Sequence, residues 1–311
     1  MSAPLVSVCM TTYNHEAYIR QAIEGVLAQR TAFGVELVVG EDCSTDATAA
    51  VCREYAERFP DRVRLLSGEC NIGWRANYRR TFEACRGRYV AYCDGDDWWD
   101  DPQKLQLQVD LLESDPSCGM CCTAAVDFYQ ATGERRPYPP ERYTDFDRLL
   151  LRTTIANCTT LARRDLIARY YDEIHPEQHP EWQTDDWPMW LWFAACSRIR
   201  FIDRPTAVHR RLPASVSHTP EYRRRIAFRD SLMGISLWFD ARYRGGRNRF
   251  RILRERSAVA LWVLSYEGSV REYLLRWWHD LRATPRLLLC PEGAGLLVKK
   301  VLFRRTKTKR S

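Results

Sequence analysis

Short hydrophobic runs alternate with segments of helical periodicity along the N-terminal part of the chain. The runs lie at 5–11, 35–39, 63–67 and 89–93, and each is followed by a polar turn. Between the first two runs, Ile19, Ile23 and Val26 recur at the spacing that places residues on one face of a helix. Because strands that alternate with helices form parallel sheets, the pattern predicts an α/β fold with helices on both faces of a mostly parallel central sheet.

The pattern continues further along the chain with less regular elements. It predicts a helix at 103–113, strands at 119–126, 157–162, 198–203 and 207–210, and a surface excursion at 132–143. A Trp-rich helix is expected to begin at the paired acids Asp185 and Asp186. Its indoles and that of Trp182 recur at helical spacing, which favours burial in the core over contact with a sugar.

Polar residues follow three of the predicted strands at the point where each strand ends. They are the loop 11–16, Asp42 after the second run, and the acidic stretch 94–97. Ligands of open α/β sheets bind beyond the carboxyl ends of the strands. We therefore expect these three loops to converge on one edge of the sheet and to form a site there.

Three carboxylates, Asp94, Asp96 and Asp97, follow the apolar strand and are separated only by Gly95. Acids this close repel one another unless a cation lies among them, and hard oxygen ligands suit Mg²⁺ or Mn²⁺. The alternative is a solvated acidic turn that caps the following helix. These residues alone leave both interpretations open.

Composition indicates a folded protein with reduced thiols. Of the 311 residues, 45% are hydrophobic and 12% aromatic, which argues against disorder. The 12 Cys residues are scattered and no secretory signal precedes them, as expected of a cytoplasmic protein. Cys118, Cys121 and Cys122 have no partners at zinc-ligand spacing and fit a core strand better than a metal site.

Charge is distributed unevenly along the chain. Residues 221–311 contain 22 Lys and Arg against 8 Asp and Glu, whereas residues 1–220 contain 25 against 32. The change predicts two domains with these boundaries, 1–220 and 221–311. No uncharged apolar run approaches the roughly 18 residues that a membrane-spanning helix needs.

The basic region 223–311 is expected to form helices, at 250–264, 270–281 and 296–303. Arg-rich faces lie opposite Trp, Leu and Phe, which is the pattern of a helix that lies in a membrane interface. The alternative is a helical appendage with its charges in water. Nucleic acid is not favoured as a partner, because no recognised binding module accompanies the charge.

Five motifs in a fixed order carry a resemblance to a known family. They are Ser7–Asn14, Glu41–Asp46, Asn71–Gly73, Asp94–Asp97 and Thr184–Trp187. In this order the chain resembles the family 2 glycosyltransferases of the GT-A fold, over about residues 4–218. The resemblance implies transfer of a sugar from a nucleotide-diphosphate sugar, usually a UDP-sugar, to an acceptor hydroxyl with inversion at the sugar carbon.

The same resemblance assigns residues to the nucleotide pocket. Thr12, Tyr13, Asn14 and Glu16 match the loop that lines it, and Asp42 matches the acid that binds the base. These roles are implied by the family motif.

The resemblance also assigns the metal and the catalytic base. Asp94 and Asp96 match the Asp-x-Asp pair, the first near the ribose and the metal and the second a direct ligand of Mn²⁺ or Mg²⁺. Asp186 matches the catalytic base, and Asp185 beside it is the alternative.

One departure from the family concerns histidine. Leu212 stands where the family often has His, so either His209 or His218 takes over its role or no imidazole contributes. Trp98 and Trp99, which follow the acids, are expected to contact the acceptor.

These inferences predict a metal-dependent, hexosyltransferase-like enzyme that uses a glycan or lipid-linked acceptor in cell-surface polysaccharide synthesis. We expect it in the cytoplasm, peripheral on the inner face of the membrane. The alternative is a non-catalytic sugar-nucleotide-binding scaffold subunit of a glycan assembly complex. A nucleotidyltransferase is disfavoured, because no Gly-rich phosphate loop follows the first strand.

Overall fold

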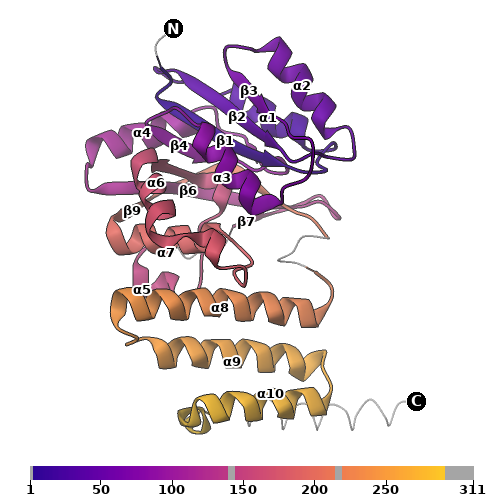
Figure 1. Cartoon of the computed structure of the whole chain (residues 1–311), viewed down its shortest axis with the longest axis vertical. Coiled ribbons are helices and arrows are strands. Elements are labelled where there is room, and N and C mark those ends of the chain that lie inside the picture. Colours follow the sequence, from indigo (N-terminus) through magenta and orange to yellow (C-terminus); the bar gives the residue numbers. More distant parts are fainter. Residues whose placement is uncertain (1–2, 139–143, 214–218, 291–311) are drawn as a thin grey trace. The chain divides into compact units, whose positions relative to one another are not determined.

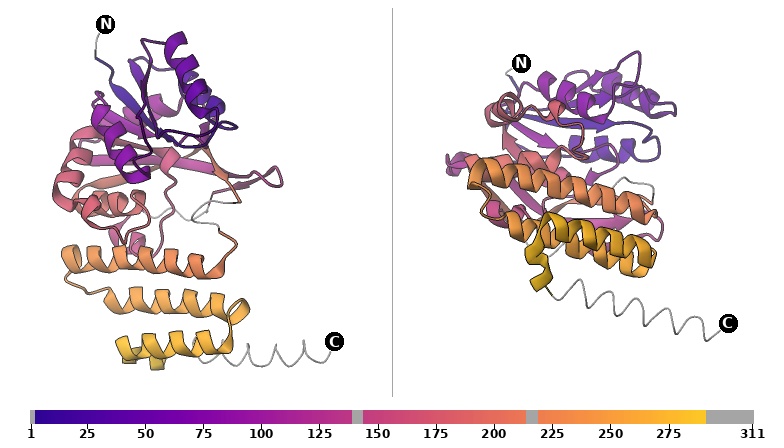
Figure 2. Two further views of the ribbon diagram at one scale, coloured as in Figure 1. Left: turned by 45° about the vertical axis from the view of Figure 1, so that its right-hand side comes forward. Right: turned by 60° about the horizontal axis from the view of Figure 1, so that its bottom comes forward.

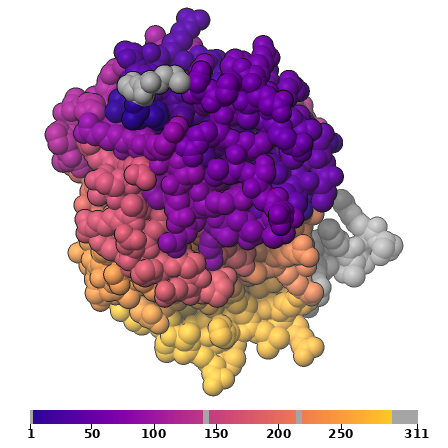
Figure 3. Space-filling view, turned by 45° about the horizontal axis from the view of Figure 1, so that its top comes forward, coloured from indigo at the N-terminus to yellow at the C-terminus, as the bar shows by residue number. Residues whose placement is uncertain are grey.

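The computed structural model describes residues 3–138, 144–213 and 219–290, and its chain divides into two compact units (Figure 1). The first unit comprises Met1–Pro180 and Asp185–Leu212. The second comprises Glu181–Thr184 and Pro213–Ser311. On the face shown in Figure 3, much of the surface of the first unit comes from the N-terminal part of the chain, coloured indigo to purple.

The first unit is built on one sheet, of nine strands among the described residues, in the order β3-β2-β1-β4-β8-β6-β9-β5, with β7 paired to β6. The strands are β1 (Val6–Thr12), β2 (Val35–Glu41), β3 (Val63–Leu66), β4 (Tyr89–Tyr92), β5 (Trp98–Trp99), β6 (Cys118–Tyr129), β7 (Glu134–Pro137), β8 (Thr160–Arg163) and β9 (Arg198–Arg211).

The prediction of a mostly parallel sheet is confirmed, and the parallel pairs are concentrated in its first half. β3, β2, β1 and β4 run parallel to their neighbours. β8 is antiparallel to both β4 and β6, whereas β9 runs parallel to β6. The predicted sites therefore follow strands of the parallel half, whose carboxyl ends share one edge.

Helices cover both faces of the parallel half. One face of β1 carries Val6, Val8 and Met10, which belong to a single apolar cluster with residues of α1, α2 and α4. On the other face Gly40 lets α3 pack directly on β2, because a Cβ at this position would lie 1.8 Å from Thr81 Oγ1. The helices of this unit are α1 (Ile19–Leu27), α2 (Thr48–Arg58), α3 (Trp74–Ala84), α4 (Lys104–Ser114), α5 (Phe146–Leu149), α6 (Arg164–Ile174) and α7 (Asp186–Cys196), with 3-10 turns η1 (Asn157–Thr159) and η2 (Pro176–Gln178).

Some predicted elements differ from those observed. Residues 157–159 form the 3-10 turn η1, so the strand predicted at 157–162 is shortened to β8. The two short strands predicted at 198–203 and 207–210 are one strand, β9, which is interrupted by register shifts against β6. The surface excursion 132–143 contains the exposed strand β7, and its residues 139–143 lie outside the described residues.

The second unit consists of α8 (Tyr222–Arg244), α9 (Arg249–Tyr266), α10 (Val270–Ala283) and the 3-10 helix η4 (Pro285–Leu289), together with 181–184. Figure 2 shows the three long helices stacked side by side. Leu261, Leu264 and Tyr273 form a small apolar cluster between α9 and α10. The predicted helices 250–264 and 270–281 are confirmed, whereas the one predicted at 296–303 lies outside the described residues.

α8 was not predicted, because its apolar residues show no clear stripe at helical spacing. Within the described ranges, each helix is either too short or too polar to span a bilayer.

Candidate functional site

The loop at the carboxyl end of β1 contacts the loops at the carboxyl ends of β2 and β4, so the three loops meet at one edge of the sheet, as the sequence predicts. The backbone N–H of Asp42 donates to the carbonyl of Thr12 at 3.1 Å. The N–H of Gly95 donates to the carbonyl of Thr11 at 2.9 Å. A Cβ on Gly95 would lie 2.6 Å from Thr12 Oγ1, so the acidic loop rests directly on the β1 loop.

The loop after β1 is bound tightly to the loop after β2. Asn14 has a positive φ of 55°, and its side-chain oxygen accepts from the backbone of Thr45 at 2.9 Å. Glu16 accepts from the backbone of Ala47 at 2.8 Å. These contacts occupy the two hydroxyl residues that stand before α2. Ser44 and Thr45 bond to Asn14 and provide no helix cap.

Tyr13 differs from its neighbours in the same loop, because its ring is exposed. Thr12 is buried, and its hydroxyl lies 3.3 Å from His15 Nδ1. Of the four residues that the family motif assigns to the nucleotide pocket, Asn14 and Glu16 thus shape the loop, while Tyr13 offers a free aromatic face.

Asp42 joins the second and third motifs. Its buried carboxylate accepts from the backbone N–H groups of Ile72 at 2.9 Å and Gly73 at 3.1 Å. Gly73 has a φ of 86°, a conformation that favours glycine, and it directly precedes α3. The carboxylate accepts one bond on each oxygen, which leaves further lone pairs for a ligand.

The three acids after β4 lie in different environments. Asp94 accepts from Thr11 Oγ1 at 3.0 Å and from Asn157 Nδ2 at 2.9 Å, and Asp97 accepts from the backbone of Arg210 at 2.8 Å. Asp96 is partly exposed, and no described residue forms a hydrogen bond or an ion pair with its carboxylate. Asp96 is therefore the acid with oxygens available to a ligand.

Burial and crowding disfavour the charged forms of two of these acids. Burial raises the pKa of Asp94 to about 7, and the charges of Asp96 and Asp97 raise it further. Burial likewise raises the pKa of Asp97 to about 6, with Asp96 contributing and His209 opposing. A cation placed among these carboxylates would relieve both effects.

The donor set fits a hard divalent ion that takes part of its coordination from elsewhere. Among the described residues, no group of three or more His, Cys, Asp or Glu side chains could hold a metal ion by itself. Mg²⁺ sites commonly use one or two carboxylates, with waters and substrate phosphates as the remaining ligands. Asp96 with Asp94 matches this kind of site.

Arg210 supports the acidic loop and was missed by sequence reasoning. Its Nε donates to the carbonyl of Asp96 at 2.7 Å, and its terminal nitrogens donate to Gln21 and Gln130. The guanidinium lies 4.5 Å from the ring centroid of Trp98. An Arg at the end of a strand more than a hundred positions away gives no sequence signal for this contact.

Asp185 and Asp186 lie at the start of α7 in different settings. Asp185 is buried and pairs with Arg75 Nε at 2.8 Å. Burial raises its pKa to about 6, although Arg75 opposes the shift. Asp186 is less buried, and its Oδ1 accepts from the backbone of Trp187 at 2.7 Å. Arg75 lies two residues after Gly73, so this pair of acids lies near the Asp42 loop.

The Trp residues of this region pack in the interior. Trp187, Trp190 and Trp192 are fully buried, which confirms the prediction that they are core residues. The expectation that Trp98 and Trp99 contact the acceptor is wrong. Both are buried, and Trp99 Nε1 donates to the carbonyl of Cys158 at 2.7 Å.

His209 is bound by protein groups. Its Nδ1 lies 3.0 Å from Asp127 Oδ1, and its ring packs edge-on against Tyr138. Burial lowers the pKa of His209, but the charges of Asp97 and Asp127 outweigh it and raise the pKa above its usual value. His218 lies outside the described residues.

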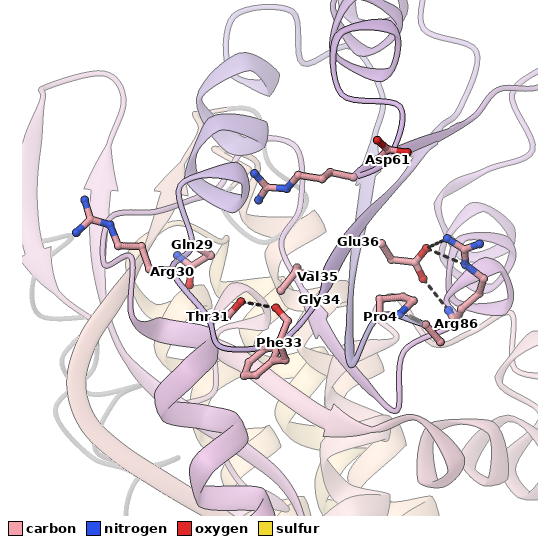
Figure 4. Close-up of a pocket in the computed structure, with 12 residues that line it drawn as sticks. Pro4, Gln29, Arg30, Thr31, Phe33, Gly34, Val35, Glu36, Asp61 and Arg86 are labelled. Atoms are coloured by element: carbon pink, nitrogen blue, oxygen red, sulfur yellow. Dashed lines mark hydrogen bonds and ion pairs between the residues drawn. The ribbon is translucent and has the colours of Figure 1, made fainter. Parts of the chain in front are cut away.

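A pocket of about 760 Å³ lies elsewhere, at the amino ends of the strands (Figure 4). It is lined by Pro4 before β1, Glu36 in β2 and Arg86 before β4. Glu36 accepts from Arg86 at 2.6 Å and from Ser7 at 2.6 Å, so its charge is already satisfied. This pocket is at the sheet edge opposite to the acidic loops.

Comparison with known proteins decides the family. The sequence profile described as "Glycosyl transferase family 2" matches residues 7–170. The chain is also 34% identical over 270 residues to the uncharacterised protein Rv1520 of Mycobacterium tuberculosis, covering 85% of this chain and 75% of that protein. The chain belongs to glycosyl transferase family 2.

Named relatives of this glycosyltransferase include the putative teichuronic acid biosynthesis glycosyltransferase TuaG of Bacillus subtilis. The two are 32% identical over 160 residues, which cover 51% of this chain and 61% of TuaG.

Solved structures show that the fold is that of the GT-A glycosyltransferases. S. aureus TarS in complex with UDP-GlcNAc matches with a TM-score of 0.56 and 14% identity, over 97% of this chain and 92% of that one. The mannosyltransferase PcManGT of Pyrobaculum calidifontis, in complex with GDP-Man and Mn²⁺, matches with a TM-score of 0.57 and 18% identity, over 97% and 87%.

Proposed function

We propose that this glycosyltransferase moves a sugar from a UDP-sugar to a hydroxyl of a glycan or lipid-linked acceptor in cell-surface polysaccharide synthesis. The observation that carries the proposal is the carboxylate of Asp96, which has no partner among the described residues and lies in the loop that contacts the Thr12 backbone segment. Asp42 borders the same segment. A carboxylate suited to bind the nucleobase therefore lies beside a carboxylate suited to bind the metal ion of a diphosphate.

The donor nucleotide would bind across the loops after β1 and β2. The lone pairs of Asp42 that remain free suit the ring N–H of uracil, since Ile72 and Gly73 take one bond on each oxygen. Thr12, Asn14 and Glu16 keep the loop in place, and the exposed ring of Tyr13 supplies a surface for the nucleoside.

A divalent ion, Mn²⁺ or Mg²⁺, would be held by Asp96 and Asp94. When bound, such an ion neutralises charge on a diphosphate leaving group. Thr11 and Asn157 orient Asp94, and Arg210 holds the backbone of Asp96, so these ligands are positioned before the donor arrives.

Asp186 would accept the proton of the acceptor hydroxyl as the new glycosidic bond forms. Asp185 is less suited to this role, because it is buried and paired with Arg75. A positioned base of this kind contributes about 10²–10⁴ in rate. Attack by one hydroxyl from the side opposite to the leaving diphosphate inverts the sugar carbon.

Two relatives support the choice of donor and pathway. S. aureus TarS has been solved with UDP-GlcNAc, and TuaG is named for teichuronic acid biosynthesis. In our proposal the enzyme works in the cytoplasm at the inner face of the membrane, and the basic region 223–311 keeps it at that surface.

The proposal is tested by measuring UDP release from UDP-sugars with Mn²⁺ and a glycan or lipid-linked acceptor. Asp96→Ala and Asp186→Asn are each expected to lower turnover by at least about 10²-fold. Asp100→Ala is the matched control, because this exposed acid follows the same loop and only bridges Arg135 at 3.4 Å. It is expected to retain full activity.

Full activity of either Asp96→Ala or Asp186→Asn would refute the assigned roles. Tight binding of UDP-sugars by calorimetry without turnover on any acceptor would instead identify a binding subunit.

A further inference from the structure

The helix α10 places the ion-paired Arg276 and Asp280, together with Tyr273, on its inner side and exposes large apolar residues on its outer side. On the inner side Arg276 bonds to both oxygens of Asp230 on α8, at 2.7 and 2.8 Å, and to Asp280 at 2.9 Å. Arg256 of α9 lies 3.3 Å from Asp230, so the ion pairs connect all three helices. Helices of soluble proteins usually show the reverse arrangement.

The outer side of α10 exposes three large apolar residues. Leu274 is 44% exposed, Leu275 58% and Trp278 61%. Together with the exposed Arg271 and Arg282 they occupy positions i, i+3, i+4, i+7 and i+11, which fall on one arc of a helix. Basic residues beside Trp and Leu are the composition of a helix that lies in a membrane interface.

Charge around this arc has one sign. From 271 to 290 the exposed charged residues are Arg271, Arg282 and Arg286. The two acids of this stretch point elsewhere: Glu272 caps α10 and pairs with Arg223, and Asp280 is buried. The following η4 exposes Leu288 and Leu289 as well. The surface therefore combines apolar side chains with a positive field.

We propose that the outer face of α10, formed by Leu274, Leu275 and Trp278 and flanked by Arg271 and Arg282, binds anionic lipid bilayers. It deepens the membrane contact of the proposed function by naming the residues that insert, and it does not depend on sugar transfer. Leu and Trp would enter the boundary between headgroups and acyl chains, while each Arg would be attracted to the anionic headgroups.

Charge complementarity separates the bilayer from other occupants of this face. In a symmetric pair of α10 helices, Arg271 and Arg282 of one copy would approach those of the other, and like charges repel. The chain's own residues 291–311 contain seven Lys and Arg against one Glu, so they do not complement the face either. An anionic lipid surface satisfies both the apolar and the basic residues.

The test uses the full chain with sucrose-loaded vesicles, sedimented in the absence of donor and acceptor. Vesicles of phosphatidylcholine alone are compared with vesicles that contain phosphatidylglycerol. Binding is expected only with the anionic lipid and is expected to weaken with added salt, because exposed charges are screened. Trp278 is expected to shift its fluorescence to shorter wavelength on binding.

Two variants locate the contact. The double variant Leu275→Ala with Trp278→Ala is expected to lower vesicle binding on the order of ten-fold, because it removes apolar area from the inserted face. Trp262→Ala is the matched control, since this Trp is similarly exposed, at 55%, but belongs to α9. It is expected to bind vesicles like the unchanged protein.

Three results would overturn the proposal. They are unchanged binding of the double variant, equal loss in Trp262→Ala, and a dimer in light scattering that only the double variant dissociates. Loss of binding on removal of 291–311 with no effect of the double variant would assign the contact to that segment instead. Asp96→Ala is expected to bind vesicles normally, which separates this proposal from the catalytic one.

Discussion

Each unit of this protein contains a largely buried cation with its own kind of surroundings, Lys104 in the first unit and Arg276 in the second. In the first unit Lys104 is 0% exposed, donates to the neutral Gln108 at 2.7 Å and lies 4.2 Å from the ring centroid of Trp99. It forms no ion pair with a described residue. In the second unit Arg276 is held between the carboxylates of Asp230 and Asp280.

The pKa values show what the partners change. Burial lowers the pKa of Lys104 to about 8, since thiols and an amide offset little of the lost hydration. Burial also acts to lower the pKa of Arg276, but the adjacent Asp230 and Asp280 outweigh it and raise the pKa above its usual range. Carboxylate partners therefore favour the charged form of a buried cation more strongly than neutral partners do.

Anions in the same molecule show the same contrast. Asp280 is paired with Arg276 and stabilises the packing of the helices. The acids after β4 are close together and have no ion pair among the described residues, which is the condition under which a ligand supplies the missing charge. Ion pairing thus distinguishes Asp280, which has a structural role, from the acids after β4, which are candidates for binding a ligand.

The largest expected effect comes from removing the paired cation. Arg276→Met is expected to lower the free energy of unfolding by about 3 kcal/mol, because Asp280 stays buried and only Arg256 remains near it. Urea unfolding followed by circular dichroism measures the change. Arg271→Met, on the exposed side of the same helix, is expected to stay within about 0.5 kcal/mol of the unchanged protein. Equal losses in both variants would contradict the role of the pairing.

A smaller effect is expected at Arg210, a third largely buried cation, which binds mainly to neutral groups. Arg210→Lys is expected to lower sugar transfer by about 10- to 100-fold, because an ammonium cannot reach Asp96, Gln21 and Gln130 together. Turnover in the UDP-release assay is the measurement. Arg204→Lys is the control, since Arg204 is exposed on β9 and pairs with Asp101. Full activity of Arg210→Lys would show that the acidic loop is held without this contact.

The smallest effect is expected at Lys104 and depends on pH. Between about pH 8 and pH 10.5 the unfolded chain binds a proton at Lys104 that the folded protein does not. The unfolding free energy of the unchanged protein is therefore expected to rise relative to that of Lys104→Met as pH increases, on the order of 1–2 kcal/mol from pH 7.5 to 9.5. Urea unfolding at the two pH values measures the difference. A constant difference would mean that Lys104 is hydrated in the folded protein.

Much of the first unit could be predicted because its signals are local. Each apolar run and the polar residues after it are neighbours in the chain, so the strands and the meeting of their loops followed from the pattern. The supports of the acidic loop were not predicted. Asn157 lies 63 residues from Asp94, and Arg210 lies 114 residues from Asp96, at positions without a distinguishing pattern.

Hydrophobic spacing by itself determined that residues 270–281 form a helix with distinct faces, and it determined that three acids end a buried strand. Only the tertiary structure decided which face of α10 is turned inward and which carboxylates meet a cation. The reason is physical. Periodicity depends on residues a few positions apart in the chain. Burial and ion pairing of α10 depend instead on contacts with residues of α8 and α9, which are distant from α10 in the sequence.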